Sequence, residues 1–210
     1  MTIKNLVFDI GGVLADYRLK EFLAEKGFGP EMIRRILKAS VLSPCWGQFE
    51  RGEISEDEAL EGFAFSDPEN RDELGRAYAS VAGMLTAREY SIPLLKALKE
   101  AGFQLYYLSN YSKKAYDECG ESLSFMPFMD GGLVSFQAHK TKPDPEMFTM
   151  FLERYGLDAG ECIFIDDTAE NVEAAIKLGF EGIVFTSYQQ LAADLSRFGV
   201  ICPDLGENTK

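Results

Sequence analysis

Short apolar runs alternate with helical segments along this chain, and this alternation constrains the fold more than any other feature. Apolar runs of strand length occupy residues 3–8, 103–108, 132–136, 162–165 and 181–185. Segments with helical spacing lie between and after them, at residues 92–101, 113–122, 145–155, 170–178 and 188–198. Strands that alternate with helices form right-handed βαβ units around a parallel sheet. The pattern therefore predicts an α/β fold with a doubly wound parallel sheet.

A long helical stretch separates the first apolar run from the second. Residues 19–38 have helical spacing, and Ser55 stands ahead of three acidic residues, as an N-cap does at the start of a helix. We therefore expect the sheet to be interrupted by a helical insertion. The expected division is a core of residues 1–15 and 86–205, a helical cap of residues 16–85 and a frayed polar tail of residues 206–210.

The charge balance disfavours several classes of function. The 210 residues include 21 Lys and Arg against 34 Asp and Glu, a formal net charge of −13. Such a surface repels phosphate backbones and anionic lipid headgroups, so we expect neither a nucleic-acid partner nor a membrane partner. A phosphorylated substrate would need a local cationic site or a metal ion.

Cysteine and histidine usage points away from disulfide and zinc chemistry. None of the four cysteines, Cys45, Cys119, Cys162 and Cys202, stands in a ligand spacing, so free thiols in a reducing cytoplasm are expected. We find no secretory signal and no apolar run long enough to span a bilayer, and we expect a cytoplasmic protein. The one histidine, His139, is interpreted as an exposed loop residue.

Chemically active side chains follow the expected strands. They are Asp9, Ser109, Asn110, Lys142, Asp166 and Asp167. Each alone is typical of a turn or a helix cap, but parallel strands bring their carboxyl ends to one edge of the sheet, where ligands bind. Three carboxylates brought together there need a cation, and Mg²⁺ prefers carboxylate and carbonyl oxygens. The sequence therefore predicts a Mg²⁺ site at this edge.

Four motifs, in order and spacing, resemble those of the haloacid dehalogenase (HAD) superfamily of phosphohydrolases. They are Phe8-Asp9-Ile10-Gly11-Gly12-Val13-Leu14, Leu108-Ser109-Asn110, Lys142-Pro143-Asp144-Pro145 and Ile165-Asp166-Asp167-Thr168-Ala169-Glu170-Asn171. The resemblance spans Ile3 to about Phe185, nearly the whole chain. It implies a HAD-like Rossmannoid core with a C1-type helical cap, and a Mg²⁺-dependent phosphatase acting on a small phosphorylated metabolite.

The resemblance also implies a metal site. Asp9 would contact Mg²⁺ together with the main-chain carbonyl of Gly11 and the carboxylate of Asp167. Asp166 would stand behind these ligands. Asn171 follows Asp167 by one helical turn, and it would hold Asp167 or a water on the metal.

The same resemblance implies how the phosphoryl group is handled. Asp9 would be the nucleophile, and attack by its carboxylate would form an aspartyl-phosphate. Ser109 and the main chain of Asn110 would bind phosphoryl oxygens. Lys142 would do the same, and it would neutralise both Asp9 and the charge that develops in the transition state.

Gly11 departs from the superfamily pattern. Most superfamily phosphatases have a second Asp at this position, which protonates the leaving group and then activates water. Loss of such a group lowers the rate by about 10² to 10⁴. Three explanations remain open: an acidic leaving group such as the anomeric hydroxyl of a sugar 1-phosphate, a substitute acid among Asp16, Glu50 and Glu53, or an impaired catalyst.

The helical insertion contains a candidate specificity segment. Glu50-Arg51-Gly52-Glu53-Ile54-Ser55, together with the Asp-x-Gly of the first motif, is similar to bacterial glucose-1-phosphate phosphatases. This similarity implies substrate contacts from Trp46, Glu50, Arg51 and Glu53, and a sugar phosphate as the leading substrate class. For Trp46 the simpler interpretation is a hydrophobic anchor between helices.

Other functions are consistent with parts of the pattern. A haloacid dehalogenase would use the same nucleophile on carbon without Mg²⁺, and the pair Asp166 and Asp167 argues against it. A phosphate-binding or regulatory module with low turnover would explain Gly11. A phosphomutase would depend on the missing Asp. The oligomeric state is open at this stage.

Overall fold

The computed structural model describes residues 2–205, and the expected frayed tail at residues 206–210 lies outside the described residues. A five-stranded sheet forms its centre, with the strand order β5-β4-β1-β6-β7 and every pair parallel. The strands are β1 (Asn5–Phe8), β4 (Gln104–Ser109), β5 (Gly131–Val134), β6 (Cys162–Asp166) and β7 (Glu181–Val184). This arrangement confirms the predicted doubly wound α/β fold.

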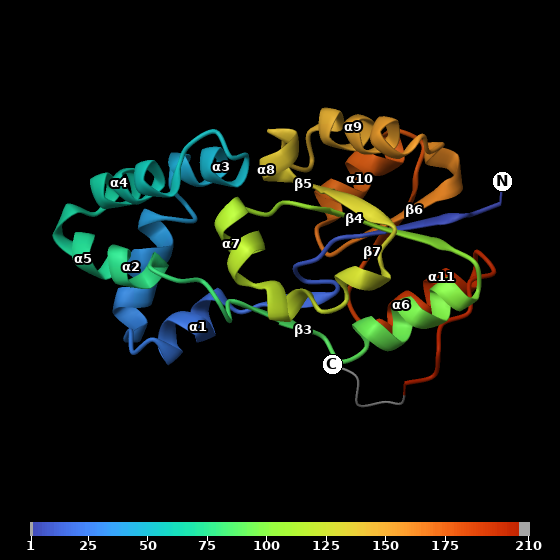
Figure 1. Cartoon of the computed structure of the whole chain (residues 1–210), viewed down its shortest axis with the longest axis horizontal. Coiled ribbons are helices and arrows are strands. Elements are labelled where there is room, and N and C mark those ends of the chain that lie inside the picture. The colour runs from blue at the N-terminus through green and yellow to red at the C-terminus, as the bar shows by residue number, and fades with distance from the viewer. Residues whose placement is uncertain (1, 206–210) are drawn as a thin grey trace.

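Helices cover both faces of the sheet (Figure 1). They are α6 (Ser91–Glu100) and α11 (Tyr188–Ser196) on one face, and α9 (Pro145–Tyr155) and α10 (Ala169–Lys177) on the other. Successive side chains of a strand point to opposite faces, so Leu6 and Phe8 pack with the α6 and α11 side while Val7 packs with the α9 and α10 side. The inner strands β1 and β6 are therefore buried on both faces, which is why their sequences are apolar without alternation.

The helix α9 illustrates how local sequence sets an element. Asp144 caps its first turn by accepting a hydrogen bond from the backbone N–H of Glu146, and Pro145 occupies the first helical position. At the other end Gly156 takes a left-handed conformation with φ +63°, which a glycine adopts without strain. The predicted bounds of this helix are confirmed.

The insertion between β1 and α6 is helical, as predicted. It contains α1 (Leu19–Glu25), α2 (Pro30–Ala39), α3 (Pro44–Glu50), α4 (Glu56–Ser66), a 3-10 turn at Pro68–Asn70 and α5 (Arg71–Tyr78). Ser55 and Glu58 form a reciprocal capping box at the start of α4, so the predicted N-cap is confirmed. Trp46 stacks on Phe63 with ring centroids 6.1 Å apart, and Phe49 and Tyr78 complete an aromatic cluster between the cap helices.

A second, two-stranded antiparallel sheet joins the cap to the core, and the sequence pattern did not predict it. Its strands are β2 (Ala15–Tyr17) and β3 (Leu85–Ala87). They are short and lie at the two ends of the expected insertion, whose bounds at 16 and 85 stay a prediction. Two further contacts stabilise the pairing of β2 with β3. Arg88 Nε lies 2.7 Å from Asp16 Oδ1, and the N–H of Arg18 donates to the carbonyl of Met84.

Two expected elements are followed by helical turns that the sequence pattern did not predict. The helix predicted over residues 113–122 ends early: α7 is Lys113–Glu118, and a 3-10 turn follows at Gly120–Leu123. The strand predicted over residues 132–136 also ends early, because the chain turns into the short helix α8 (Ser135–Ala138). Further 3-10 turns occupy Met126–Phe128 and Ala159–Glu161.

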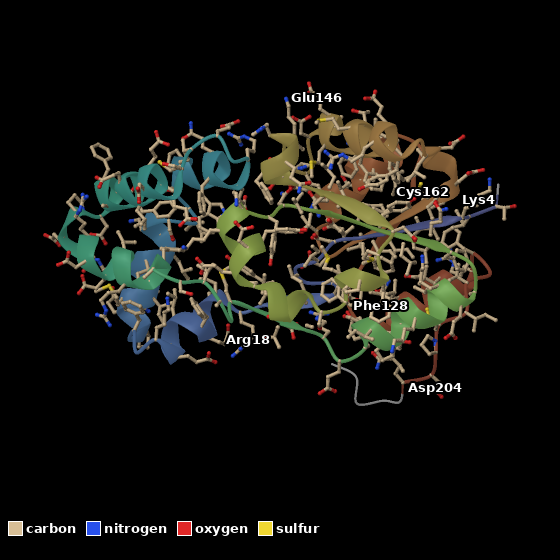
Figure 2. All side chains as sticks on the ribbon, in the orientation of Figure 1. Lys4, Arg18, Phe128, Glu146, Cys162 and Asp204 are labelled. Carbon is tan, nitrogen blue, oxygen red and sulfur yellow. The ribbon has the colours of Figure 1, made fainter. Side chains whose placement is uncertain are left out.

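The carboxyl ends of the strands face the cap. Lys4 and Cys162, where β1 and β6 begin, lie at the opposite end of the molecule (Figure 2), and Lys4 pairs there with Glu161 at 2.6 Å. The site predicted from the strand ends therefore lies between the core and the cap. Within residues 2–205, no helix combines the length and the apolar character that crossing a bilayer requires.

Candidate active site

The register of the central strands brings the predicted site residues together. Phe8 is paired with Tyr107 of β4 and with Ile165 of β6. Asp9, the next residue, therefore lies between Ser109 at the end of β4 and Asp166 at the end of β6. The three positions share one edge of the sheet because neighbouring parallel strands end there together.

Lys142 connects the carboxylates of Asp9 and Asp166. Its Nζ lies 2.9 Å from Asp9 Oδ1 and 2.6 Å from Asp166 Oδ2, and the residue is 4% exposed. Burial by itself would lower the pKa of Lys142, but the two neighbouring carboxylates outweigh that effect and the pKa is raised. The lysine is therefore a permanent cation beside Asp9.

Asp9 is poised at the base of the pocket. It is 9% exposed, and its Oδ1 accepts a hydrogen bond from the N–H of Ile10. Burial and the nearby charge of Asp166 raise the pKa of Asp9 to about 6, while Lys142 and a hydrogen bond from Ser109 act against the rise. A carboxyl group with this pKa is ionised at neutral pH, although its burial disfavours the charged form.

Asp166 is fully occupied by protein partners. Besides Lys142, it accepts a hydrogen bond from the N–H of Thr168 at 2.8 Å and contacts Asn171 Nδ2 with both oxygens at 3.1 Å. Asn171 was expected to hold Asp167 or a metal-bound water; the structure gives its side chain a different partner, and the contact with a metal-bound water stays a prediction. One turn into α10, its amide reaches back to the buried Asp166 instead, where an unsatisfied carboxylate would be costly.

Asp167 completes a group of carboxylates that fits a divalent cation. One oxygen each from Asp9, Asp166 and Asp167 lie within 4.8 Å of one another. Asp166 is bonded to Lys142, whereas burial and the negative charge of Asp166 raise the pKa of Asp167. Asp9 and Asp167 are thus two hard oxygen donors whose repulsion a cation would relieve, so the donor set fits Mg²⁺.

Gly12 is required beside this group. Its φ is +78°, and a side chain built on it would overlap the carboxylate of Asp167. Gly11 differs, because its φ is ordinary and the heavy atom nearest to a built Cβ is Tyr17 Cβ at 4.0 Å. The structure therefore has room for a side chain at position 11, and the loop geometry does not explain why an Asp is missing there.

Asn110 connects two loops of the site. Its Nδ2 donates to the carbonyl of Lys142 at 3.0 Å, and its Oδ1 accepts from the N–H of Lys142 at 2.8 Å. The side chain is therefore used to hold the lysine loop, which contains a cis peptide bond between Lys142 and Pro143. Asn110 also lines the pocket, and the expected binding of phosphoryl oxygens by its main chain stays a prediction.

A pocket of about 470 Å³ opens above these residues. The core contributes Asp9, Gly11, Ser109, Asn110 and Asp167 to its lining, and the cap contributes Trp46 and Glu50. Trp46 thus serves both the aromatic cluster of the cap and the pocket wall. Burial raises the pKa of Glu50, while hydrogen bonding to the Trp46 side chain and the charge of Arg51 act against the rise.

Arg51 and Glu53 are not among the described residues that line this pocket, and their expected contact with substrate stays a prediction. Arg51 Nε lies 2.7 Å from Glu53 Oε1 and Nη2 lies 2.9 Å from Oε2, so each neutralises the other on the surface. His139 is exposed, as expected, and its Nδ1 contacts the carbonyl of Arg51 at 2.8 Å.

Sequence reasoning missed several residues of the pocket wall. Tyr17, Met84, Leu85 and Arg88 come from β2, β3 and the residues beside them. Their positions depend on the antiparallel sheet between cap and core, whose strands are too short to leave a periodic signal. Tyr111, which follows the second motif, also lines the pocket.

Comparison with known proteins agrees with this geometry. The sequence profile of the haloacid dehalogenase-like hydrolase family matches residues 3–179. Flavin mononucleotide hydrolase 1 of Arabidopsis thaliana is 32% identical over 160 residues, which are 74% of this chain and 62% of that protein. The chain therefore spans less than two thirds of the length of this relative.

Two other relatives match over most of their length. The sesquiterpene phosphatase astK of Aspergillus oryzae is 28% identical over 88% of this chain and 91% of its own. The D-ribitol-5-phosphate phosphatase of Bacteroides thetaiotaomicron is 27% identical over 85% of this chain and 90% of its own.

Solved structures share the fold. The HAD family enzyme BT-2542 of Bacteroides thetaiotaomicron, in complex with magnesium and inorganic phosphate, superposes with a TM-score of 0.70 and 25% identity, covering 90% of this chain and 98% of its own. The L-2-haloacid dehalogenase of Xanthobacter autotrophicus superposes with a TM-score of 0.63 at 21% identity, over 96% of this chain and 85% of its own. With the family profile covering most of its length, the chain belongs to the haloacid dehalogenase-like hydrolases.

Proposed function

We propose that this protein is a Mg²⁺-dependent phosphatase that hydrolyses a small phosphomonoester through an aspartyl-phosphate on Asp9. The observation that carries the proposal is the pairing of Asp9 with Lys142 at 2.9 Å, beside a carboxylate group that fits a divalent cation. Relatives named as phosphatases, and a solved relative with magnesium and phosphate bound, support the same chemistry.

Each residue has a defined task in this mechanism. The free carboxylate oxygen of Asp9 attacks phosphorus and the ester oxygen departs. Lys142 neutralises Asp9 in the resting enzyme, and its charge stabilises the phosphoryl oxygens as negative charge develops on them. Ser109 and the main chain at Asn110 bind these oxygens and orient them. Asp9, Asp167 and the carbonyl of Gly11 would hold Mg²⁺, which supplies charge neutralisation to the phosphoryl group when bound. Water then releases phosphate from Asp9.

The substrate class that we propose is a sugar phosphate. The pocket combines aromatic side chains, Trp46, Tyr17 and Tyr111, with the charged groups of Asp16 and Arg88. Aromatic faces can pack against the apolar faces of a sugar ring, while charged groups bond its hydroxyls. A sugar 1-phosphate is favoured within this class, because its anomeric hydroxyl is a more acidic leaving group and depends less on a general acid than an ordinary alcohol does.

A substrate screen tests the proposal directly. Sugar phosphates, nucleotides, acyl phosphates and aryl phosphates are incubated with the purified protein, with Mg²⁺ and after chelation, and Asp9→Asn serves as the blank. We expect phosphate release that requires Mg²⁺, is absent in Asp9→Asn, and is faster on glucose 1-phosphate than on glucose 6-phosphate. Equal or faster turnover of the 6-phosphate would contradict the 1-phosphate preference alone.

Two other outcomes would replace the proposal. Release of halide from a 2-haloacid that persists after chelation would identify a dehalogenase. Binding of Mg²⁺ and beryllium fluoride without hydrolysis of any ester would identify a phosphate-binding module.

A further inference from the structure

Glu50 is a carboxylate of the pocket wall that the mechanism above leaves without a task. Four acidic residues appear among the described residues that line the pocket: Asp9, Asp16, Glu50 and Asp167. Asp9 and Asp167 belong to the nucleophile and metal site. Asp16 is paired with Arg88 at 2.7 Å, in a contact that also joins the two sides of the β2–β3 sheet. Glu50 comes from the cap and faces the same space from the other side.

The main chain around Glu50 is fixed against the core. The carbonyl of Glu50 accepts a hydrogen bond from Ser135 Oγ at 2.6 Å, and the carbonyl of Arg51 contacts His139 Nδ1 at 2.8 Å. Gly52 has φ +64°, and a Cβ on it would lie 3.1 Å from the carbonyl oxygen of Phe136. The end of α3 therefore docks closely on α8, which places it beside the core in Figure 1. These contacts of the main chain hold Glu50 at the pocket, without a contribution from its side chain.

The surroundings of the Glu50 side chain suit a group that exchanges protons. The adjacent cation, Arg51, is engaged by Glu53 in a two-point pair. The groups that act electrostatically on Glu50 are the indole of Trp46 on its own helix, Arg51 beside it, and Asp9 and Lys142 across the pocket. The charge of Glu50 also contributes to the raised pKa of Tyr17 in β2. Burial raises the pKa of Glu50, the direction that an acid working near neutral pH needs.

The space beside Gly11 is open. An ideal Cβ there has Tyr17 Cβ at 4.0 Å as its nearest neighbour, so the position from which the superfamily's second Asp would act is open. A leaving group can therefore extend past Gly11 toward the cap, where Trp46 and Glu50 form the wall.

We propose that Glu50 is the general acid and base of this enzyme, in place of the side chain that Gly11 lacks. The assignment rests on the proposed phosphatase function. In the first step the bond from Asp9 to phosphorus forms, the bond from phosphorus to the ester oxygen breaks, and the proton of the Glu50 carboxyl moves to that oxygen. In the second step the Glu50 carboxylate takes a proton from water, the hydroxide oxygen attacks phosphorus, and Asp9 leaves with its electron pair.

The test compares esters that differ in how much they need an acid. We use p-nitrophenyl, phenyl and benzyl phosphate, which share one ring and have progressively less acidic leaving groups. Glu50→Gln keeps the size of the side chain and its ability to accept from Trp46. We expect it to lower kcat/KM less than about tenfold on p-nitrophenyl phosphate and by about 10² to 10⁴ on benzyl phosphate.

Two further variants control the comparison. Glu53→Gln changes an acidic residue of the same segment that lies outside the pocket, and we expect equal activity on all three esters. Gly11→Asp, added to Glu50→Gln, puts a carboxyl group into the open position, and we expect it to restore activity on benzyl phosphate more than on p-nitrophenyl phosphate. Such rescue would not follow from a merely structural role.

The outcomes separate the assignment from the proposed function. A loss in Glu50→Gln that is the same on all three esters, or no loss on benzyl phosphate, would overturn the role of Glu50 while leaving the phosphatase intact. Inactivity of the wild-type protein on all three esters and on the screened metabolites would overturn the phosphatase function and this role with it.

Discussion

The ammonium nitrogen of Lys142 lies 2.9 Å from Oδ1 of Asp9, and both side chains are buried. The residues come from different loops: Asp9 follows β1, and Lys142 lies between α8 and α9. Lys142 bonds Asp166 as well, at 2.6 Å, so one cation is shared by two carboxylates. The two carboxylates and the one ammonium group together have a net negative charge, so this buried cluster can bind a further cation.

Replacing Lys142 by Met is expected to damage both the fold and the chemistry. The substitution leaves two buried carboxylates without a counter-charge, and removing one partner of a buried pair lowers the free energy of unfolding by about 3–5 kcal/mol. Turnover should fall by at least about 10², the scale of losing a group that stabilises transition-state charge. Chemical denaturation and steady-state kinetics measure the two effects.

Lys140→Met is the matched control for that variant. Lys140 is two residues away and pairs with Glu146 at 2.6 Å on the surface. Exposed pairs contribute little, so the change in stability should stay within about 0.5 kcal/mol and turnover should not change. Equal effects from the two substitutions would show that the buried position of Lys142 is unimportant.

Local sequence was sufficient to predict the sheet and the residues at its edge. Buried parallel strands such as β6 leave an apolar run, and helices such as α9 carry a Pro at one end and a Gly at the other. Once the strands are parallel, Asp9 and Asp166 must meet, so the core of the site follows from topology.

Contacts that depend on packing between distant segments could not be predicted in this way. The pairing of β2 with β3 involves three residues on each side, too few for a period, and it brings Tyr17 and Arg88 to the pocket. Whether the Asn171 amide bonds Asp166 or Asp167 depends on the exact turn between β6 and α10. The sequence does not distinguish Glu50 from Glu53 as a pocket residue. The docking of α3 on α8 places Glu50 at the pocket and leaves Glu53 on the surface, paired with Arg51.

The affinity for Mg²⁺ should depend on pH through Asp9. Its pKa is raised from the ordinary value of 3.8 to about 6, and the pKa of Asp167 is raised as well. Protons compete with the metal below this pKa, so the affinity should fall about tenfold for each pH unit below 6 and level off above about 7. Calorimetric titration with Mg²⁺ between pH 5 and 8 measures this. A constant affinity over that range would contradict it.

Asp9→Asn should stabilise the metal-free protein while it abolishes turnover. The folded-state pKa of Asp9 lies above the unfolded one, so the folded state binds more protons and loses stability as pH rises from about 4 through 6. At pH 8 the ionised carboxylate costs on the order of 3 kcal/mol, from about two pKa units at 1.36 kcal/mol each.

Thermal unfolding with and without Mg²⁺ checks this prediction. Without metal, Asp9→Asn should unfold at a higher temperature than the wild type at pH 8, and the difference should shrink as pH falls toward 4. Added Mg²⁺ should stabilise the wild type more than the variant, because a ligand that binds the folded state more tightly stabilises it more. A variant less stable than the wild type without metal would show that Asp9 contributes favourably to the fold.

Gly12→Ala should weaken the metal site through the position of Asp167. The methyl group would overlap the Asp167 carboxylate, which must move, and alanine at φ +78° adds roughly 1–2 kcal/mol of strain. Gly102→Ala is the control, because φ there is +91° and a Cβ would meet no heavy atom within 4 Å. Both variants should therefore lose similar stability, but only Gly12→Ala should lose Mg²⁺ affinity in calorimetry and turnover in the phosphatase assay. Equal Mg²⁺ affinities would mean that Asp167 can retreat from the methyl group without leaving the metal site.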